Sequence, residues 1–453
     1  MIRRLMGGVG ANIFDKLVVT CTQLAMVPVM AGTWGLHLYG LWVLMFTAPS
    51  FLAMGDFGFA QAAGTKMTMA VARGQRDEAV HIFQSAWMAI LSSSALLLAL
   101  TAALALLLPA SVFGSDPGMA VGDIRLTLFL LMFYGIAAIQ GSIFFAAFRA
   151  AGMFAVGAFW NALIILIESG ALIAAVLMGA SPVVAAATIL CGRLVGLAGQ
   201  NVLLRKRVPW LRIGFARATL AETRSLFAPA GAVMLVPIAQ AFYLQGTALA
   251  LGVAAGQAAV PAFTAVRTLS RIGLQMCWLV NTPLMPEFSS AHARGDRRAQ
   301  ALMVLATIAV STVLIVPYAL LFGLLAQPIV TLWTHGVIHS SQSLIWAMAG
   351  GILFGGFWFP LSNLILALNR HASYTGWFVL LAGFSLPLTY VLAQLLGPTG
   401  AGLSMLTLDV AMFVLIAILA RRILLQPGEL RAAVSQALRR LHYPFARSEA
   451  SPP

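Results

Sequence analysis

The sequence has very little charge. Only 9% of its 453 residues are Asp, Glu, Lys or Arg, whereas soluble globular proteins have about 25%. Hydrophobic residues make up 61% of the chain, and its mean hydropathy is +0.94. So few charged side chains cannot cover a surface that faces water. The composition therefore excludes a soluble enzyme or binding module and indicates an integral membrane protein.

The sequence is also poor in residues that support catalysis or metal binding. Its three cysteines, Cys21, Cys191 and Cys277, fall inside apolar segments, so they predict small buried side chains and no disulfide framework. Walker, Gly-x-Ser-x-Gly and His-Glu-x-x-His motifs are missing. His335 and His339 stand four residues apart but have no evident third ligand. We therefore expect no enzyme and no resident metal or cofactor.

Apolar segments of membrane-spanning length fill most of the chain. About 20 such residues cross the hydrocarbon core, which is about 30 Å thick. The sequence predicts an all-α integral membrane protein with about twelve transmembrane helices. The expected spans are 12–32, 38–62, 81–108, 124–147, 155–178, 183–203, 226–250, 257–283, 301–326, 343–367, 374–396 and 401–420.

A basic segment in the middle of the chain separates the first six spans from the last six. It begins at Arg205-Lys206-Arg207 and ends at Arg224. We predict an N-terminal six-helix bundle at 1–203, a basic cytoplasmic linker at 204–225, a C-terminal six-helix bundle at 226–422 and a cytoplasmic tail at 423–453. In the tail, apolar residues recur with helical spacing on one face, and arginines flank that face. This pattern is typical of an amphipathic helix on an anionic lipid surface.

The two halves share a short sequence motif. Ala72-Arg73-Gly74-Gln75-Arg76 follows the second span of the first half, and Ala293-Arg294-Gly295-Asp296-Arg297 follows the second span of the second half. Parallel repeats of six spans are a transporter architecture, with the substrate site between the halves near the middle of the membrane. We therefore expect two bundles around a central cavity, lined by spans one, two, seven and eight.

The distribution of Lys and Arg predicts the orientation. Loops that stay in the cytoplasm carry an excess of these residues. With twelve spans, the termini and the even-numbered loops share one side, and this side holds the basic loop 66–78, the 205–224 segment and Arg294 to Arg298. Both termini are therefore expected in the cytoplasm. Topology accounts for the net charge of +14, so the charge does not indicate nucleic acid binding.

Four segments of the first half resemble the N-terminal region of bacterial polysaccharide flippases, which export O-antigen or exopolysaccharide precursors. They are Trp34-Gly35, Tyr39-Gly40-Leu41-Trp42, Gly55-Asp56-Phe57-Gly58-Phe59 and Ala72-Arg73-Gly74. These flippases belong to the multidrug/oligosaccharidyl-lipid/polysaccharide (MOP) exporter superfamily. Its layout of two six-helix halves matches this chain over about 1–425.

The resemblance implies a function and a set of partners. It implies that the chain moves an undecaprenyl-pyrophosphate-linked oligosaccharide across the bacterial inner membrane by alternating access, driven by an ion gradient. It further implies a monomer that contacts membrane lipids and works beside a polysaccharide polymerase and glycosyltransferases.

Two arginines in the eighth span are the strongest substrate-binding candidates. An ionisable side chain inside a span is costly and should face a partner or a wet cavity. Arg267 and Arg271 are four residues apart, so they share one helix face. Two guanidiniums on one face suit a pyrophosphate, which accepts bidentate charge-assisted hydrogen bonds. The alternative is that each arginine pairs with an acid on another span, such as Asp56 or Glu168.

Four further ionisable residues within spans are candidates. Lys16, near the cytoplasmic end of the first span, either contacts the lipid-linked substrate, as the resemblance implies, or extends to the membrane interface. Asp56 resembles the family's Asp-x-Gly element and could equally be structural. Glu168 and Asp409, both in the middle of spans, either bind a coupling ion or pair with a base such as Arg193.

Two other functions fit parts of the sequence. A cation-coupled multidrug exporter of the same superfamily would share the fold, but a site for cationic drugs should be acidic and aromatic, in contrast to the paired arginines. A membrane-embedded polysaccharide polymerase or ligase usually carries a large periplasmic loop, and no predicted outer loop here is that long.

Overall fold

The structure is a computed structural model that describes residues 2–52, 58–107, 118–281, 288, 291–292, 294–368, 370 and 372–424. Within these ranges all regular secondary structure is helical. The helices are α1 (Ile2–Leu52), α2 (Phe59–Ala72), α3 (Arg76–Leu107), α4 (Val121–Ala150), α5 (Phe154–Leu177), α6 (Pro182–Arg207), α7 (Leu220–Ala241), the π-helical turn η3 (Phe242–Gly246), α8 (Thr247–Ala255), α9 (Ala259–Asn281), α11 (Arg297–Trp333), α12 (Gln342–Ala367), α13 (Ala372–Leu396) and α14 (Pro398–Ile423).

The helices have the length and apolarity of a multi-pass membrane protein. Ten of those described are long and apolar enough to span a membrane. The first of these, Phe14–Pro49, is interrupted at Gly35, where φ is 74° and ψ is 171°, so the helical segment before Gly35 is long enough to span the membrane and a second segment follows it. The 23 residues of α9 extend about 34 Å, which is also enough to cross the hydrocarbon core. The predicted all-α membrane fold is confirmed.

One predicted boundary is wrong. Residues 66–78 were expected to form a loop, but α2 continues to Ala72 and α3 begins at Arg76, so only 73–75 form the turn. The helix continues past Lys66 because Met67 and Ala70, in its last turns, are fully buried in the core of the first bundle.

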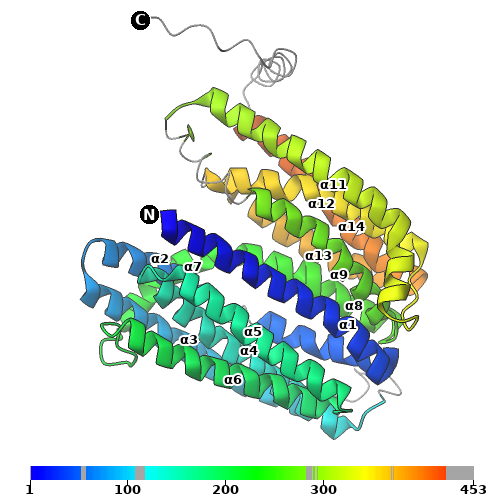
Figure 1. Cartoon of the computed structure of the whole chain (residues 1–453), viewed down its shortest axis with the longest axis horizontal. Helices are drawn as coiled ribbons and strands as arrows, with labels where there is room; N and C mark the ends of the chain where they lie inside the picture. The colour runs from blue at the N-terminus through cyan, green and yellow to red at the C-terminus, as the bar shows by residue number, and fades with distance from the viewer. Residues whose placement is uncertain are drawn as a thin grey trace, which may run out of the picture.

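The helices form two bundles that meet along α1, as Figure 1 shows. In the first bundle α1 packs on α5, and α4 packs on α2, α3 and α6. In the second, α14 packs on α12 and α13, while α9 and α11 pack on α12. Contacts of α1 with α8 and α9 join the bundles, and α7 adds contacts to α2 and α3. At the α1–α8/α9 junction Gly40 lies so close to the Gln257 carbonyl oxygen that a Cβ atom would be only 1.9 Å from it.

The internal repeat is confirmed by the backbone. Gly74 and Gly295, which are 221 residues apart, have φ angles of 79° and 71°. The residues after them make equivalent hydrogen bonds, Gln75 N–H to the Ala70 carbonyl and Asp296 N–H to the Ala291 carbonyl, each 2.9 Å long. The same spacing relates Gly35 to Gly256, which separates α8 from α9 and has φ 85° and ψ 164°. The two halves are therefore built on one plan.

The basic segment between the halves is docked on the first bundle. Leu211 is buried, and the ring of Phe215 stacks on Trp87 of α3 with centroids 5.3 Å apart. The Gln84 side chain donates to the Arg212 carbonyl oxygen (2.9 Å) and accepts from the Arg217 backbone N–H (2.7 Å). Apolar residues among the arginines thus fix this segment against α3, an arrangement that the charge pattern did not predict.

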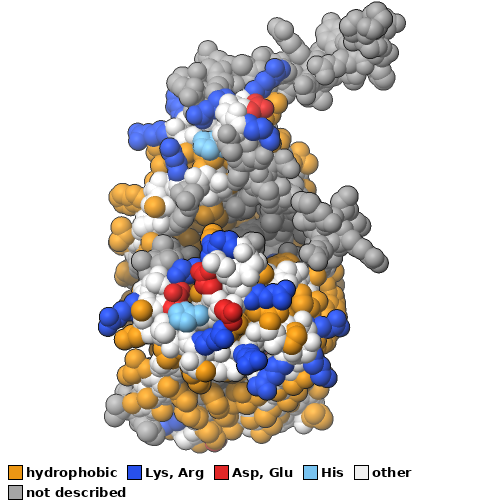
Figure 2. All heavy atoms as spheres, turned by 90° about the vertical axis from the view of Figure 1, so that its left-hand side faces the viewer, with side chains coloured by type: hydrophobic (Ala, Val, Ile, Leu, Met, Phe, Trp, Pro, Cys, Tyr) orange, Lys and Arg blue, Asp and Glu red, His pale blue; other side chains and the backbone are white. Residues whose placement is uncertain are grey.

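Lys and Arg side chains gather on the face of the molecule to which this segment belongs, over both bundles (Figure 2). This asymmetry predicts that the face lies in the cytoplasm. In a protein whose three native cysteines are replaced by alanine, a cysteine at the exposed Ala216 should stay unlabelled by a membrane-impermeant thiol reagent in intact cells. A cysteine at Met178, which is 82% exposed between α5 and α6, should be labelled. The reverse pattern would contradict the orientation.

Candidate functional site

Arg267 of α9 is buried at the junction between the bundles. Arg267 is 9% exposed, and its Nη1 atom donates to the backbone carbonyl of Leu244 in η3. The guanidinium lies over the ring of Phe263, one helical turn earlier, at 5.2 Å from the ring centroid. A π-helical turn leaves backbone carbonyls without their usual helical partners. Arg267 donates a hydrogen bond to one of these carbonyls, that of Leu244.

Arg271 lies one turn further along α9 and is partly buried. Among the described residues, neither Arg267 nor Arg271 forms an ion pair with an acid. One further turn along, Gln275 accepts a hydrogen bond of 2.9 Å from the hydroxyl of Thr20 on α1. Because residues four apart share a helix face, Arg271 belongs to the face of α9 that meets the first bundle.

The internal repeat allows the two halves to be compared at these positions. The residues 221 positions earlier, at the equivalent places in the first half, are Phe46 and Ser50. The same helix of the same plan is therefore built there without arginine. The two charges of α9 are therefore specific to the second half, in contrast to the glycine turns that both halves share.

Asp409 lies in the interior of the second bundle and is 2% exposed. Its carboxylate accepts from the hydroxyl of Tyr243 in η3 (2.6 Å) and from the indole N–H of Trp358 on α12 (3.0 Å). No basic residue of the described chain forms an ion pair with it. The turn η3 therefore contacts both candidate groups, since Tyr243 binds Asp409 and the next residue, Leu244, binds Arg267.

Glu168 forms a buried ion pair with Arg193 of α6, with 2.6 Å between the closest side-chain atoms. The hydroxyl of Tyr134 donates to the same carboxylate oxygen (2.9 Å) and accepts from Arg193 (3.1 Å). The first bundle thus buries a neutralised pair, whereas the second buries a carboxylate that has no ion pair among the described residues.

The remaining predicted residues lie away from these clusters. The Nζ atom of Lys16 is 3.6 Å from the Asp15 carboxylate, and the Lys16 side chain is 62% exposed, so this pair contributes little to stability. Asp56 and the predicted amphipathic tail helix lie outside the described residues.

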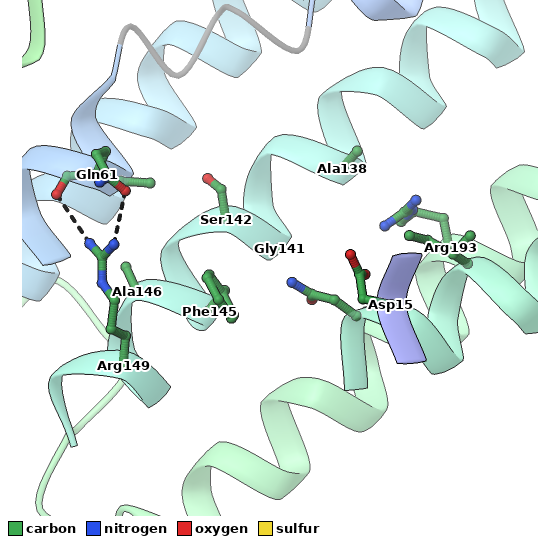
Figure 3. Close-up of a pocket in the computed structure, with 12 residues that line it drawn as sticks. Asp15, Gln61, Ala138, Gly141, Ser142, Phe145, Ala146, Arg149 and Arg193 are labelled. Carbon is green, nitrogen blue, oxygen red and sulfur yellow. Dashed lines mark hydrogen bonds between the residues drawn. The ribbon is translucent and has the colours of Figure 1, made fainter. Parts of the chain in front are cut away.

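The structure also shows a pocket of about 370 Å³ in the first bundle, between α1, α2, α4, α5 and α6. Figure 3 shows Arg149 and Arg193 at its opposite ends, with Asp15 on the side of Arg193. Its polar lining residues are Asp15, Gln61, Ser142, Arg149, Asn161 and Arg193. Arg267 and Arg271 do not line it. The sequence predicted a cavity between the two bundles and did not predict this pocket within the first bundle.

Signals for these residues were present in the sequence. Asn161 and Tyr134 carry polar groups in the middle of apolar spans, where such groups need partners. Neutral polar side chains are weaker signals than charged ones, because burying them in a membrane costs less. Among the described residues, no group of three His, Cys, Asp or Glu side chains could hold a metal ion.

The fold is that of MOP superfamily transporters. A multidrug resistance transporter of the MATE family in an inward-facing conformation matches with a TM-score of 0.68 and 13% identity, over 92% of this chain and 99% of that one. The lipid II flippase MurJ in an inward closed conformation matches with a TM-score of 0.67 and 13% identity, over 100% and 94%. A MOP superfamily transporter from Pyrococcus furiosus has a TM-score of 0.62 and 13% identity, over 95% and 96%. No protein-family model and no curated protein matches the sequence.

Proposed function

We propose that this protein, which has the fold of MOP superfamily transporters, is a flippase for an undecaprenyl-pyrophosphate-linked oligosaccharide. It would carry the oligosaccharide from the cytoplasmic to the periplasmic leaflet of a bacterial inner membrane, for synthesis of a surface polysaccharide. Both multidrug exporters and a lipid II flippase share this fold, so the choice between these substrates depends on the chemistry of the site.

The single observation that carries the proposal is the arginine pair of α9. Arg267 and Arg271 lie in a membrane-spanning helix at the junction of the two bundles and have no acidic partner among the described residues. Uncompensated charge inside a membrane is costly, and an anionic ligand relieves that cost. Pyrophosphate offers oxygens to both guanidinium forks, whereas a cationic drug would be repelled.

Purified protein in proteoliposomes would test this choice directly. We expect it to move undecaprenyl-pyrophosphate-linked oligosaccharide between leaflets, measured by the accessibility of the sugar to an added glycosidase or lectin. We expect no transport of ethidium, a cationic dye typical of multidrug exporters. Ethidium transport without movement of the lipid would instead establish the multidrug alternative.

Asp409 is the best placed group for ion coupling. Asp409→Asn removes the charge but keeps both contacts, since the amide oxygen can accept from Trp358 and the amide nitrogen can donate to Tyr243. We expect this variant to be as abundant as the unmodified protein and to transport at the rate seen without an imposed proton or Na⁺ gradient. A gradient that accelerates Asp409→Asn as much as the unmodified protein would exclude this role.

A further inference from the structure

The pocket in the first bundle is lined by an unusual set of side chains for the interior of a membrane protein. Asp15, Gln61 and Asn161 offer planar carboxylate and amide groups, and Arg149 and Arg193 offer guanidiniums. A carboxylate accepts from two neighbouring hydroxyls, a guanidinium donates to two, and an amide donates to one and accepts from the other. Small-molecule sites typically combine a few such polar groups with apolar walls.

Two of the three charges that line this pocket are neutralised within the protein, whereas Arg149 donates to the neutral Gln61 and has no ion pair among the described residues. Arg193 is paired with Glu168 at 2.6 Å, and Asp15 lies 3.6 Å from the amino group of Lys16. The Asp15 carboxylate, which lines the pocket, would repel a free anion. The lining therefore suits a neutral ligand that is rich in hydroxyl groups better than it suits a phosphate.

Unused donors and an apolar ring complete the lining. The carbonyl oxygen of Asn161 accepts from the Gln200 side chain at 3.3 Å, which leaves the two amide N–H groups of Asn161 as donors. The Arg149 guanidinium donates to Gln61, to the side-chain oxygen at 3.0 Å and the backbone oxygen at 3.3 Å (Figure 3). Phe145, whose ring packs on Phe154 with centroids 5.6 Å apart, adds an apolar surface. A sugar ring presents hydroxyl edges and an apolar C–H face, which match these two kinds of wall.

The pocket lies within reach of the arginine pair. The hydrogen bond between Thr20 and Gln275 fixes where α1 meets α9. Asp15 is five residues before Thr20, and Arg271 is four residues before Gln275, on helices that run in opposite directions (Figure 1). At 1.5 Å per residue, Asp15 and Arg271 are therefore about 13 Å apart along the helix axes. The first sugars attached to a pyrophosphate at Arg271 can cover this distance.

We infer that the pocket between α1, α2, α4, α5 and α6 binds a sugar ring of the transported oligosaccharide. This inference rests on the proposed function and divides substrate recognition between the bundles. The second bundle binds the pyrophosphate, which all lipid-linked oligosaccharides of this class share. The first bundle binds sugar and so determines which oligosaccharide is accepted.

The test measures the affinity of the purified full-length protein, in nanodiscs, for two lipids. One is undecaprenyl pyrophosphate without sugar, and the other is the same lipid with its oligosaccharide, extracted from a strain in which the flippase gene is deleted. Asn161→Ala should weaken binding of the glycosylated lipid about tenfold, as expected for one or two lost hydrogen bonds, and leave binding of undecaprenyl pyrophosphate unchanged. Ser142→Leu, which fills the pocket, should have the same selectivity.

Gln200→Leu is the matched control. It breaks the same hydrogen bond to Asn161 from a residue that is fully buried and does not line the pocket, so it should change neither affinity. Equal weakening of both lipids by Asn161→Ala, or an equal effect of Gln200→Leu, would overturn the sugar site. Unchanged binding of the glycosylated lipid in both pocket variants would overturn it too. Failure of the unmodified protein to bind either lipid would instead refute the proposed flippase function itself.

Discussion

Replacing Arg267 and Arg271 together by alanine is expected to abolish polysaccharide export while the protein remains in the membrane at normal abundance. A pyrophosphate that leaves the head-group layer loses hydration, and guanidiniums in a medium of low dielectric constant replace part of it. The fold should tolerate the change because the contacts given up are a hydrogen bond to the Leu244 carbonyl and the stacking of Arg267 over Phe263, and no described acid would lose an ion-pair partner. The equivalent helix of the first half carries Phe46 and Ser50 instead.

The measurement is complementation of a strain that lacks the flippase, with the protein quantified by immunoblot. Arg271→Lys should restore export only in part, because an ammonium keeps the charge but loses the bidentate fork. Arg212→Ala, which removes an exposed arginine from the docked linker, is the control for loss of charge and should export normally. Normal export by the double alanine variant would refute the phosphate role, and loss of the protein itself would support structural pairing.

Arg193→Ala is expected to have the largest effect on stability. It leaves the carboxylate of Glu168 buried without its cation, and breaking a buried ion pair from one side costs about 3–5 kcal/mol. Tyr134 would keep its hydrogen bond to Glu168 but cannot neutralise the charge. We expect a lower thermal midpoint of the purified protein in detergent and less protein in the membrane.

The double variant Glu168→Gln/Arg193→Leu tests the reason for this loss. It removes both charges together, so most of the lost stability should return. If the double variant were as unstable as Arg193→Ala, shape at this position rather than the buried charge would be responsible. Arg193 also lines the first-bundle pocket, so stability must be measured without substrate.

The parts of the fold that depend on apolarity and on glycine could be predicted from the sequence. Span lengths follow from the thickness of the membrane, and the repeated motif around Gly74 and Gly295 predicted a duplicated half, which the matching hydrogen bonds confirm. The docking of residues 208–219 could not be predicted, because the arginines dominate the pattern there. The apolar contacts that fix this segment, such as Phe215 on Trp87, join residues far apart in the sequence.

The candidate site was predictable only as a set of ionisable residues. Ionisable residues within apolar spans are rare because burying a charge in the membrane is costly. Glu168, Asp409 and the arginines of α9 could therefore be identified from the sequence. Their partners could not, because the choice between Arg193 and another base depends on how helices are rotated against each other. Thr20 and Gln275, which fix α1 against α9, were invisible for the same reason.

The π-helical turn has a consequence for how this gene can change. Such a turn holds about one residue more than an α-helical turn, and one residue corresponds to about 100° of rotation. Deleting a single codon within 242–246 would therefore restore a regular helix but rotate Tyr243 away from Asp409 or turn the whole of α7 on its neighbours. Homologous genes should show single-codon deletions here only where the codon at position 409 has also changed. An alignment of such sequences would therefore show the deletion within 242–246 and the change at position 409 together.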